Sequence, residues 1–182
     1  MRVLRTFGSP RAVVAVLAAI TAVQVALIAF GNITDYETNH QFVVHVLAMG
    51  TTFQSPDMMW RAITSPALVT IVYVAIIGWE TVAALVLIAA TVAWVRAFAG
   101  RGPVATARRL SSIGWLMWVA LFAGGFVAIG GEWFQMWQSQ DWNGLDAAMR
   151  NVLIAGVALV LNHLPALEPE EGTVAATSTA VT

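Results

Sequence analysis

The sequence has 182 residues, of which 59% are hydrophobic and only 10% charged, with a net charge of −1 and no cysteine. Soluble domains carry roughly 25% charged residues, so this composition predicts an integral membrane protein. The near-neutral charge argues against nucleic acid as a partner, and the lack of cysteine excludes disulfides, thiolate metal sites and cysteine nucleophiles.

Four apolar runs are long enough to cross a bilayer, because about 20 helical residues span roughly 30 Å of hydrocarbon. They cover about residues 12–30, 67–95, 110–131 and 147–164. The first run is longer than the apolar part of a signal peptide and has no clean small-residue cleavage site after it, which favours an uncleaved helix. We therefore predict an all-α four-helix transmembrane domain over residues 1–165. Residues 166–182 are polar and without periodicity, which predicts a disordered cytoplasmic tail.

The arginines predict the orientation of these helices. Seven of the nine precede the first run or follow the second, and only Arg61 and Arg150 lie in the other two connections. Because arginine-rich loops stay in the cytoplasm, both termini are predicted to be cytoplasmic and residues 31–66 to form an outer loop. The tryptophans are predicted to lie in two interfacial belts, with Trp94, Trp115 and Trp118 in the inner belt and Trp133 and Trp137 in the outer one.

Small residues recur at a spacing of four in the first and third runs, which predicts close helix packing at these positions. The two ladders are Ala18, Ala22 and Ala26, and Ala120, Gly124 and Ala128. They fit packing within one bundle and also packing against a partner protein, and the frequency of alanine in this chain favours the first.

Glu80 is the only charged residue within the second apolar run, near its midpoint. An ionised carboxylate at the bilayer centre costs roughly 2.5–3.5 kcal/mol, so we expect this side chain to face the bundle or water. Tyr73 and Thr91 share its helix face and extend the predicted polar site. Two interpretations remain: a proton or cation site, or a neutral hydrogen-bonding residue that fixes helix packing. The absence of a second buried titratable group favours the neutral residue.

The outer loop contains two predicted short amphipathic helices on the membrane surface. Residues 39–49 form the first, and the Ser-Pro-Asp sequence at 55–57 is a typical helix start that predicts a second over residues 57–63. Five residues form the predicted interaction surface of this loop: Asn39, Phe42, His45, Trp60 and Arg61. His40, His45 and Met49 are possible metal ligands by type, but the spacing of the two histidines disfavours one helix face, so no metal or other cofactor is predicted.

Three stretches of this region resemble a bacterial family of predicted small integral membrane proteins of unknown function. They are N-x-x-FVxHVLxM-x-TTF from residue 39, MMWRAITSP from residue 58 and YVAIIGWE from residue 73. The resemblance covers about residues 10–165 and implies four membrane helices in a bacterial inner membrane, without implying an activity. Family members usually carry Asp at the position of Gly50. If that Asp is a ligand or catalytic group, this chain lacks it.

Two functions of different classes fit the sequence. A non-enzymatic accessory subunit or assembly factor of a larger envelope complex fits the lack of catalytic motifs, with a membrane-protein partner or a homo-oligomer in the bilayer. The alternative is a small ion- or proton-coupled transporter that uses Glu80. A membrane enzyme ranks below both because no nucleophile or cofactor motif is found.

Overall fold

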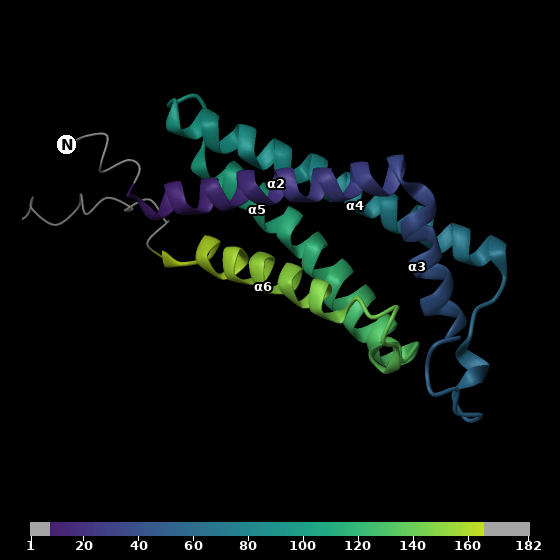
Figure 1. Ribbon diagram of the computed structural model, residues 1–182. Coiled ribbons are helices and arrows are strands. Elements are labelled where there is room, and N and C mark those ends of the chain that lie inside the picture. The colour runs from purple at the N-terminus through teal and green to yellow at the C-terminus, as the bar shows by residue number, and fades with distance from the viewer. Residues whose placement is uncertain (1–7, 166–182) are drawn as a thin grey trace, which may run out of the picture.

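The computed structural model describes residues 8–165, so the predicted disordered tail at 166–182 lies outside the described residues. The chain folds into α2 (Pro10–Thr34), α3 (Tyr36–Ala48), η1 (Met59–Arg61), α4 (Pro66–Phe98), α5 (Val104–Val119), η2 (Ala120–Trp133), η3 (Met136–Gln138) and α6 (Leu145–Asn162). No strand occurs among residues 8–165. Four antiparallel units are long and apolar enough to span a membrane: α2, α4, α5 continued by η2, and α6 (Figure 1). The prediction of an all-helical chain with four membrane helices is confirmed.

The helix boundaries follow from local chemistry. Ser9 Oγ accepts a hydrogen bond from the Ala12 backbone N–H at 3.2 Å, and Pro10 occupies the first position of α2, where its missing N–H costs nothing. α4 also begins at a proline that follows a serine, and it ends before Gly100, whose φ of 68° favours glycine. α2 continues past the predicted end at residue 30 to Thr34.

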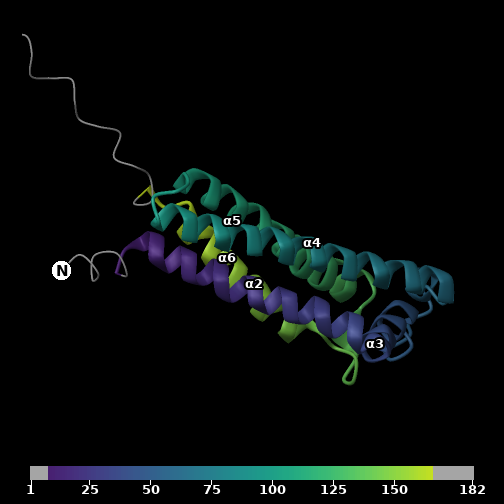
Figure 2. The same ribbon diagram turned by 90° about the horizontal axis from the view of Figure 1, so that it is seen from above.

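The four spans form two pairs, α2 with α4 and α5–η2 with α6, and the pairs diverge toward the end that holds α3 (Figure 1). α4 packs along α2 over its length and along α5, but it separates from η2, and α3 lies in the resulting gap (Figure 1). We call this the α3 end of the bundle. The opposite end holds the N-terminus of α2, the α4–α5 connection and the end of α6, and we call it the arginine-rich end (Figure 2). Arg108 and Arg109 lie there on α5 itself and not in the connecting loop.

Small residues allow the helices to approach closely in the core. Its buried alanines include Ala18 and Ala22 of the first predicted ladder and Ala155 and Ala158 of α6. The predicted ladder in the third span does not face the core, because Ala120 and Ala128 are exposed.

Three tryptophans predicted to lie in the inner belt are core residues instead. Trp94, Trp115 and Trp118 are at most 2% exposed. The indole N–H of Trp94 donates to Ser111 Oγ at 3.0 Å, and that of Trp115 donates to Thr21 Oγ1 at 2.9 Å. Buried indole N–H groups usually find an acceptor, and for Trp94 and Trp115 the small hydroxyl residues opposite supply it. The belt assignment of these three residues was therefore wrong.

The third span changes its helix type at Ala120. η2 is a π-helix, in which the Phe134 N–H donates to the Ile129 carbonyl at 3.0 Å, five residues back. π-Helices are rare and wider than α-helices. The change in residues per turn means that side chains after Ala120 do not keep the faces that a 3.6-residue period predicts.

The predicted second outer helix is reduced to a single turn. Residues 57–63 contain only η1, which follows a turn in which the Met58 and Met59 N–H groups donate to the Ser55 carbonyl. The Ile63 N–H donates to the Leu47 carbonyl at 2.8 Å and thereby ties the segment to α3. Starting a helix is costly and is repaid only when further turns follow. This segment is held by the turn at Ser55 and by the Ile63 bond to Leu47, so no further turns can follow.

Candidate functional site

The carboxyl group of Glu80 lies in the bundle interior and is held by a residue of α2. Glu80 is 3% exposed, and its Oε2 accepts a hydrogen bond from Asn32 Nδ2 at 2.6 Å. Asn32 is itself 8% exposed, and its backbone carbonyl accepts a hydrogen bond from the Tyr73 hydroxyl at 3.2 Å. These three residues therefore form one buried polar cluster that joins α2 to α4.

The sequence does not predict Asn32 as a partner of Glu80, because Asn32 belongs to a short polar stretch in the predicted outer loop. In the structure this stretch is the last turns of α2, which places Asn32 opposite Glu80. Thr91, by contrast, lies far from the cluster along α4, and its hydroxyl donates to the Leu87 carbonyl of its own helix at 2.9 Å. Thr91 is thus a local hydrogen-bonding residue, whereas Tyr73 belongs to the cluster.

A small cavity lies beside Glu80. It is lined by Trp118, Phe122 and other apolar residues, and the space open to the centre of a water molecule is about 10 Å³. The Trp118 Nε1–H is buried without a hydrogen-bond partner. A cavity of this size has room for about one water molecule.

The five residues of the predicted outer surface are divided between two places. Phe42 faces inward, where its ring lies 6.3 Å from that of Phe126, and His45 stacks on Trp142 with ring centroids 4.2 Å apart. Trp60 and Arg61 lie at the edge of the α3 end, and Asn39 is exposed on α3. Phe42 and His45 therefore hold α3 against the bundle.

Trp60 and Arg61 contact Trp133, the last residue of η2. The Trp60 and Trp133 rings meet edge to face at 5.5 Å, and the Arg61 guanidinium lies 4.6 Å from the centroid of the Trp133 ring. Arg61 Nη1 also donates to the Trp133 carbonyl at 3.3 Å. A cation over an indole face is attracted by the ring quadrupole, so this contact orients all three side chains.

The loop after α3 is joined by polar contacts to the connection between η2 and α6. Thr51 Oγ1 and Ser139 Oγ are 2.8 Å apart, and the Phe53 backbone N–H donates to Gln138 Oε1 at 2.8 Å. The Phe53 and Trp137 rings meet edge to face at 5.8 Å. Gly50 begins this loop and is exposed, and a β-carbon added to it would meet no atom within 4 Å, so a side chain fits there without a clash.

The possible metal ligands by type lie in separate environments. His40 stacks on Tyr36, His45 stacks on Trp142, and Met49 is buried in the apolar cluster beneath α3. No group of three or more His, Asp or Glu side chains suited to a metal ion converges within residues 8–165.

The four apolar spans, their buried polar cluster and the family match together define a multi-pass integral membrane protein. Residues 10–165 match the family described as predicted small integral membrane protein, DUF2165, and the chain belongs to this family. The resemblance found in the sequence is confirmed. No curated protein and no solved structure matches the chain.

Proposed function

We propose that the protein is a non-enzymatic accessory subunit or assembly factor of a larger complex in a bacterial inner membrane. In this proposal both termini are cytoplasmic and the α3 end faces outward, as the arginine distribution favours. The partner is another membrane protein, which contacts the α3 end.

One observation carries this proposal: four exposed aromatic side chains are held in fixed pairs across the α3 end. Phe53 and Trp60 are 73% and 70% exposed, and they pair with Trp137 and Trp133, which are 47% and 44% exposed. We call these four residues the aromatic rim. Tryptophan and arginine are the residue types most enriched at the energetic centres of protein interfaces, and Arg61 adjoins the rim.

The pairing reduces the entropy cost of binding, because each ring is already ordered before a partner arrives. Ordering a side chain on binding costs roughly 0.5–1.5 kcal/mol. The contact of the Phe53 backbone N–H with Gln138 and that of Arg61 with the Trp133 carbonyl fix the loops that carry the rings. Tryptophans that only anchor a protein at the membrane interface do not need to be held in such pairs, so the pairing supports a docking role.

The first test is purification of the tagged protein in a mild detergent, followed by identification and quantification of the co-purifying proteins. The double variant Phe53→Ala and Trp60→Ala is expected to lower the yield of a stoichiometric partner at least about tenfold, because truncated interface tryptophans commonly cost about 2 kcal/mol or more. A matched control is Phe30→Ala with Phe98→Ala, since these exposed aromatics lie on α2 and α4, outside the rim. Equal recovery of the partner with both double variants contradicts the proposal.

The small transporter remains a second candidate because Glu80 and the unpartnered Trp118 Nε1 belong to one intramembrane cavity. Under the accessory-subunit proposal, liposomes that contain the protein are expected to show no proton flux above that of empty liposomes, and Glu80→Gln is expected to change nothing. Flux that depends on Glu80 favours the transporter instead. The measurement is the response of an entrapped pH dye to an imposed potential.

A further inference from the structure

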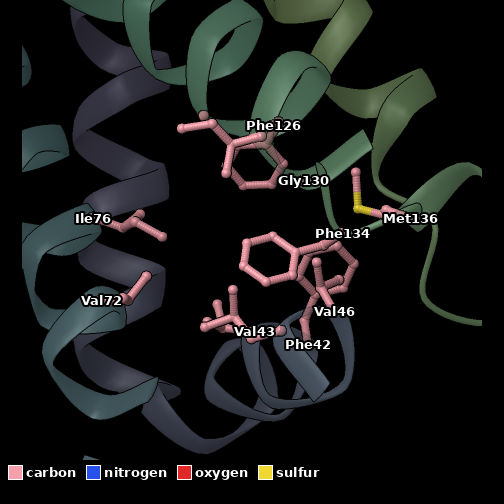
Figure 3. A pocket seen from close by; sticks show the side chains of 12 residues that line it. Phe42, Val43, Val46, Val72, Ile76, Phe126, Gly130, Phe134 and Met136 are labelled. Atoms are coloured by element: carbon pink, nitrogen blue, oxygen red, sulfur yellow. The ribbon is translucent and has the colours of Figure 1, made fainter. Parts of the chain in front are cut away.

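A separate apolar pocket lies where α4 and η2 diverge, and α3 closes its third side (Figure 3). Ile76 projects from α4, Phe126 and Gly130 line the η2 wall, and Phe42 and Val46 line the α3 wall. The volume of the pocket is about 180 Å³. We call this cavity the α3 pocket.

The lining of the α3 pocket determines the chemistry of its occupant. Every lining side chain is a hydrocarbon, apart from the thioether of Met136 and the glycines Gly125 and Gly130. No side chain in the wall therefore offers the two to four polar partners that a buried water molecule needs. Apolar cavities of about 150 Å³ stay dry and take up apolar guests, so an apolar occupant is expected here.

The position of the pocket narrows the occupant to lipid. Two of its walls belong to spans that cross the membrane, and one of the wall residues, Ile129, is 55% exposed. The outer surface of a membrane span faces lipid hydrocarbon, so the pocket beside Ile129 is adjacent to acyl chains. Helix surfaces in lipid gain from close van der Waals packing, which an empty cavity forfeits.

A cationic group lies near the same wall. Arg61 contacts Trp133, which directly precedes the wall residue Phe134. The described contacts of Arg61 are with Trp60 and Trp133 and include no carboxylate, and its Nε is buried without a partner. A guanidinium group binds phosphate well, and near a membrane surface it attracts anionic lipid.

From these observations we propose that the α3 pocket binds one acyl chain of an anionic glycerophospholipid whose phosphate group lies at Arg61. The acyl-chain pocket is lined by residues of α3, α4 and η2 and of the segment after η2, whereas Arg61, the proposed headgroup contact, adjoins the aromatic rim. Variants of Gly125 and Val46 lie outside the rim, so the acyl-chain contact can be tested separately from the proposed function.

The glycines of η2 provide a variant that fills the pocket and a neighbouring control. Gly125 lines the pocket, and a β-carbon added there meets only Leu121 Cδ1, at 3.6 Å, an ordinary contact distance. Gly124 is not part of the lining, and an added β-carbon there meets nothing within 4 Å. Gly125→Leu is therefore expected to occupy the pocket, and Gly124→Leu to leave it open.

The experiment uses the full chain in bilayers of phosphatidylethanolamine and phosphatidylglycerol, with a photoreactive diazirine on an acyl chain of the phosphatidylglycerol. After irradiation, adducts are mapped by mass spectrometry. Wild type and Gly124→Leu are expected to carry adducts on residues 42–47. In Gly125→Leu the yield of these adducts is expected to fall about tenfold, which is equivalent to a loss of roughly 1.4 kcal/mol in binding free energy. Val46→Phe fills the pocket from α3 and is expected to give the same loss. Labelling of residues 42–47 that neither filling variant reduces overturns the proposal.

Arg61→Gln tests the headgroup contact in the same bilayers. Loss of this one charge is expected to reduce labelling of residues 42–47 by about fivefold, because a basic residue near an anionic surface contributes roughly 1 kcal/mol. Labelling that responds to Gly125→Leu but not to Arg61→Gln overturns the anionic phospholipid assignment and indicates a neutral apolar occupant.

Discussion

Replacing Asn32 by leucine is expected to lower the free energy of unfolding by about 0.6–1.7 kcal/mol, the average and the upper value measured for hydrogen bonds between membrane helices. Asn32 Nδ2 donates to Glu80 Oε2, and both residues are less than a tenth exposed. Leucine has a similar size but no donor, so the Glu80 carboxyl group would lose its hydrogen bond while remaining inside the bundle. Reversible unfolding in mixed micelles, followed by circular dichroism, measures the change.

Further variants separate the hydrogen bond from the buried carboxyl group. Glu80→Gln keeps an oxygen that accepts from Asn32 and is expected to cost less than about 1 kcal/mol, since hydrogen bonds between membrane helices average about 0.6 kcal/mol. Glu80→Leu combined with Asn32→Leu removes both polar groups, and its cost is expected to be smaller than the sum of the single variants. Thr91→Ala is the control, because Thr91 bonds only to its own helix. Additive costs for the two leucine substitutions would show that the pair is not coupled.

The second large effect is expected at Gly114 of α5, where α4 and α5 approach closely. A β-carbon added to Gly114 would lie 2.5 Å from Leu87 Cδ2 and 2.6 Å from Leu87 Cγ. Leu87 is 0% exposed, so its side chain has little room to move aside. Gly114→Ala is therefore expected to destabilise the bundle by about 1–3 kcal/mol, the range observed for overpacked cores. The same unfolding measurement in micelles applies.

A compensating change tests whether Leu87 is the cause. Combining Gly114→Ala with Leu87→Ala removes the clashing atoms, and Gly114→Ala is expected to cost much less in that background than in the wild type. Gly156→Ala in α6 is the matched control, because an added β-carbon there meets nothing within 4 Å. If Gly114→Ala and Gly156→Ala cost the same, close packing against Leu87 does not limit stability.

The spans could be predicted from composition and length because a run of apolar residues is a local signal. The burial of Glu80 also followed from local information, since its own position in an apolar run sets the cost of exposing it to lipid. Its partner Asn32 could not be found in this way. The two residues are 48 positions apart, and only the packing of α2 on α4 brings them together.

The positions of the tryptophans and the faces of the third span were predicted less well, for two physical reasons. Tryptophan has an apolar ring and one donor, so it suits both a membrane interface and a core that offers an acceptor, and Thr21 and Ser111 provide such acceptors. The π-helical geometry of η2 also changes the angle between successive side chains, so a wheel drawn at 3.6 residues per turn does not describe the faces of the residues after Ala120.

The outer segment illustrates how tertiary contacts override a local signal. Ser55 and Pro56 do begin a turn, as their types indicate, yet the bond from the Ile63 N–H to the Leu47 carbonyl fixes the chain before a helix can continue. Phe42 belongs to the predicted interaction surface of the outer loop, but its ring lies inward, beside that of Phe126.

The bond between Asn32 and Glu80 also has a consequence for the order of events during synthesis. A nascent α4 that leaves the translocon alone would carry the carboxyl group of Glu80 into lipid without a donor. Asn32 belongs to the preceding span and is already made when α4 emerges. Insertion of α4 is therefore favoured when α2 waits beside the translocon, so that the two helices enter the bilayer as a hairpin.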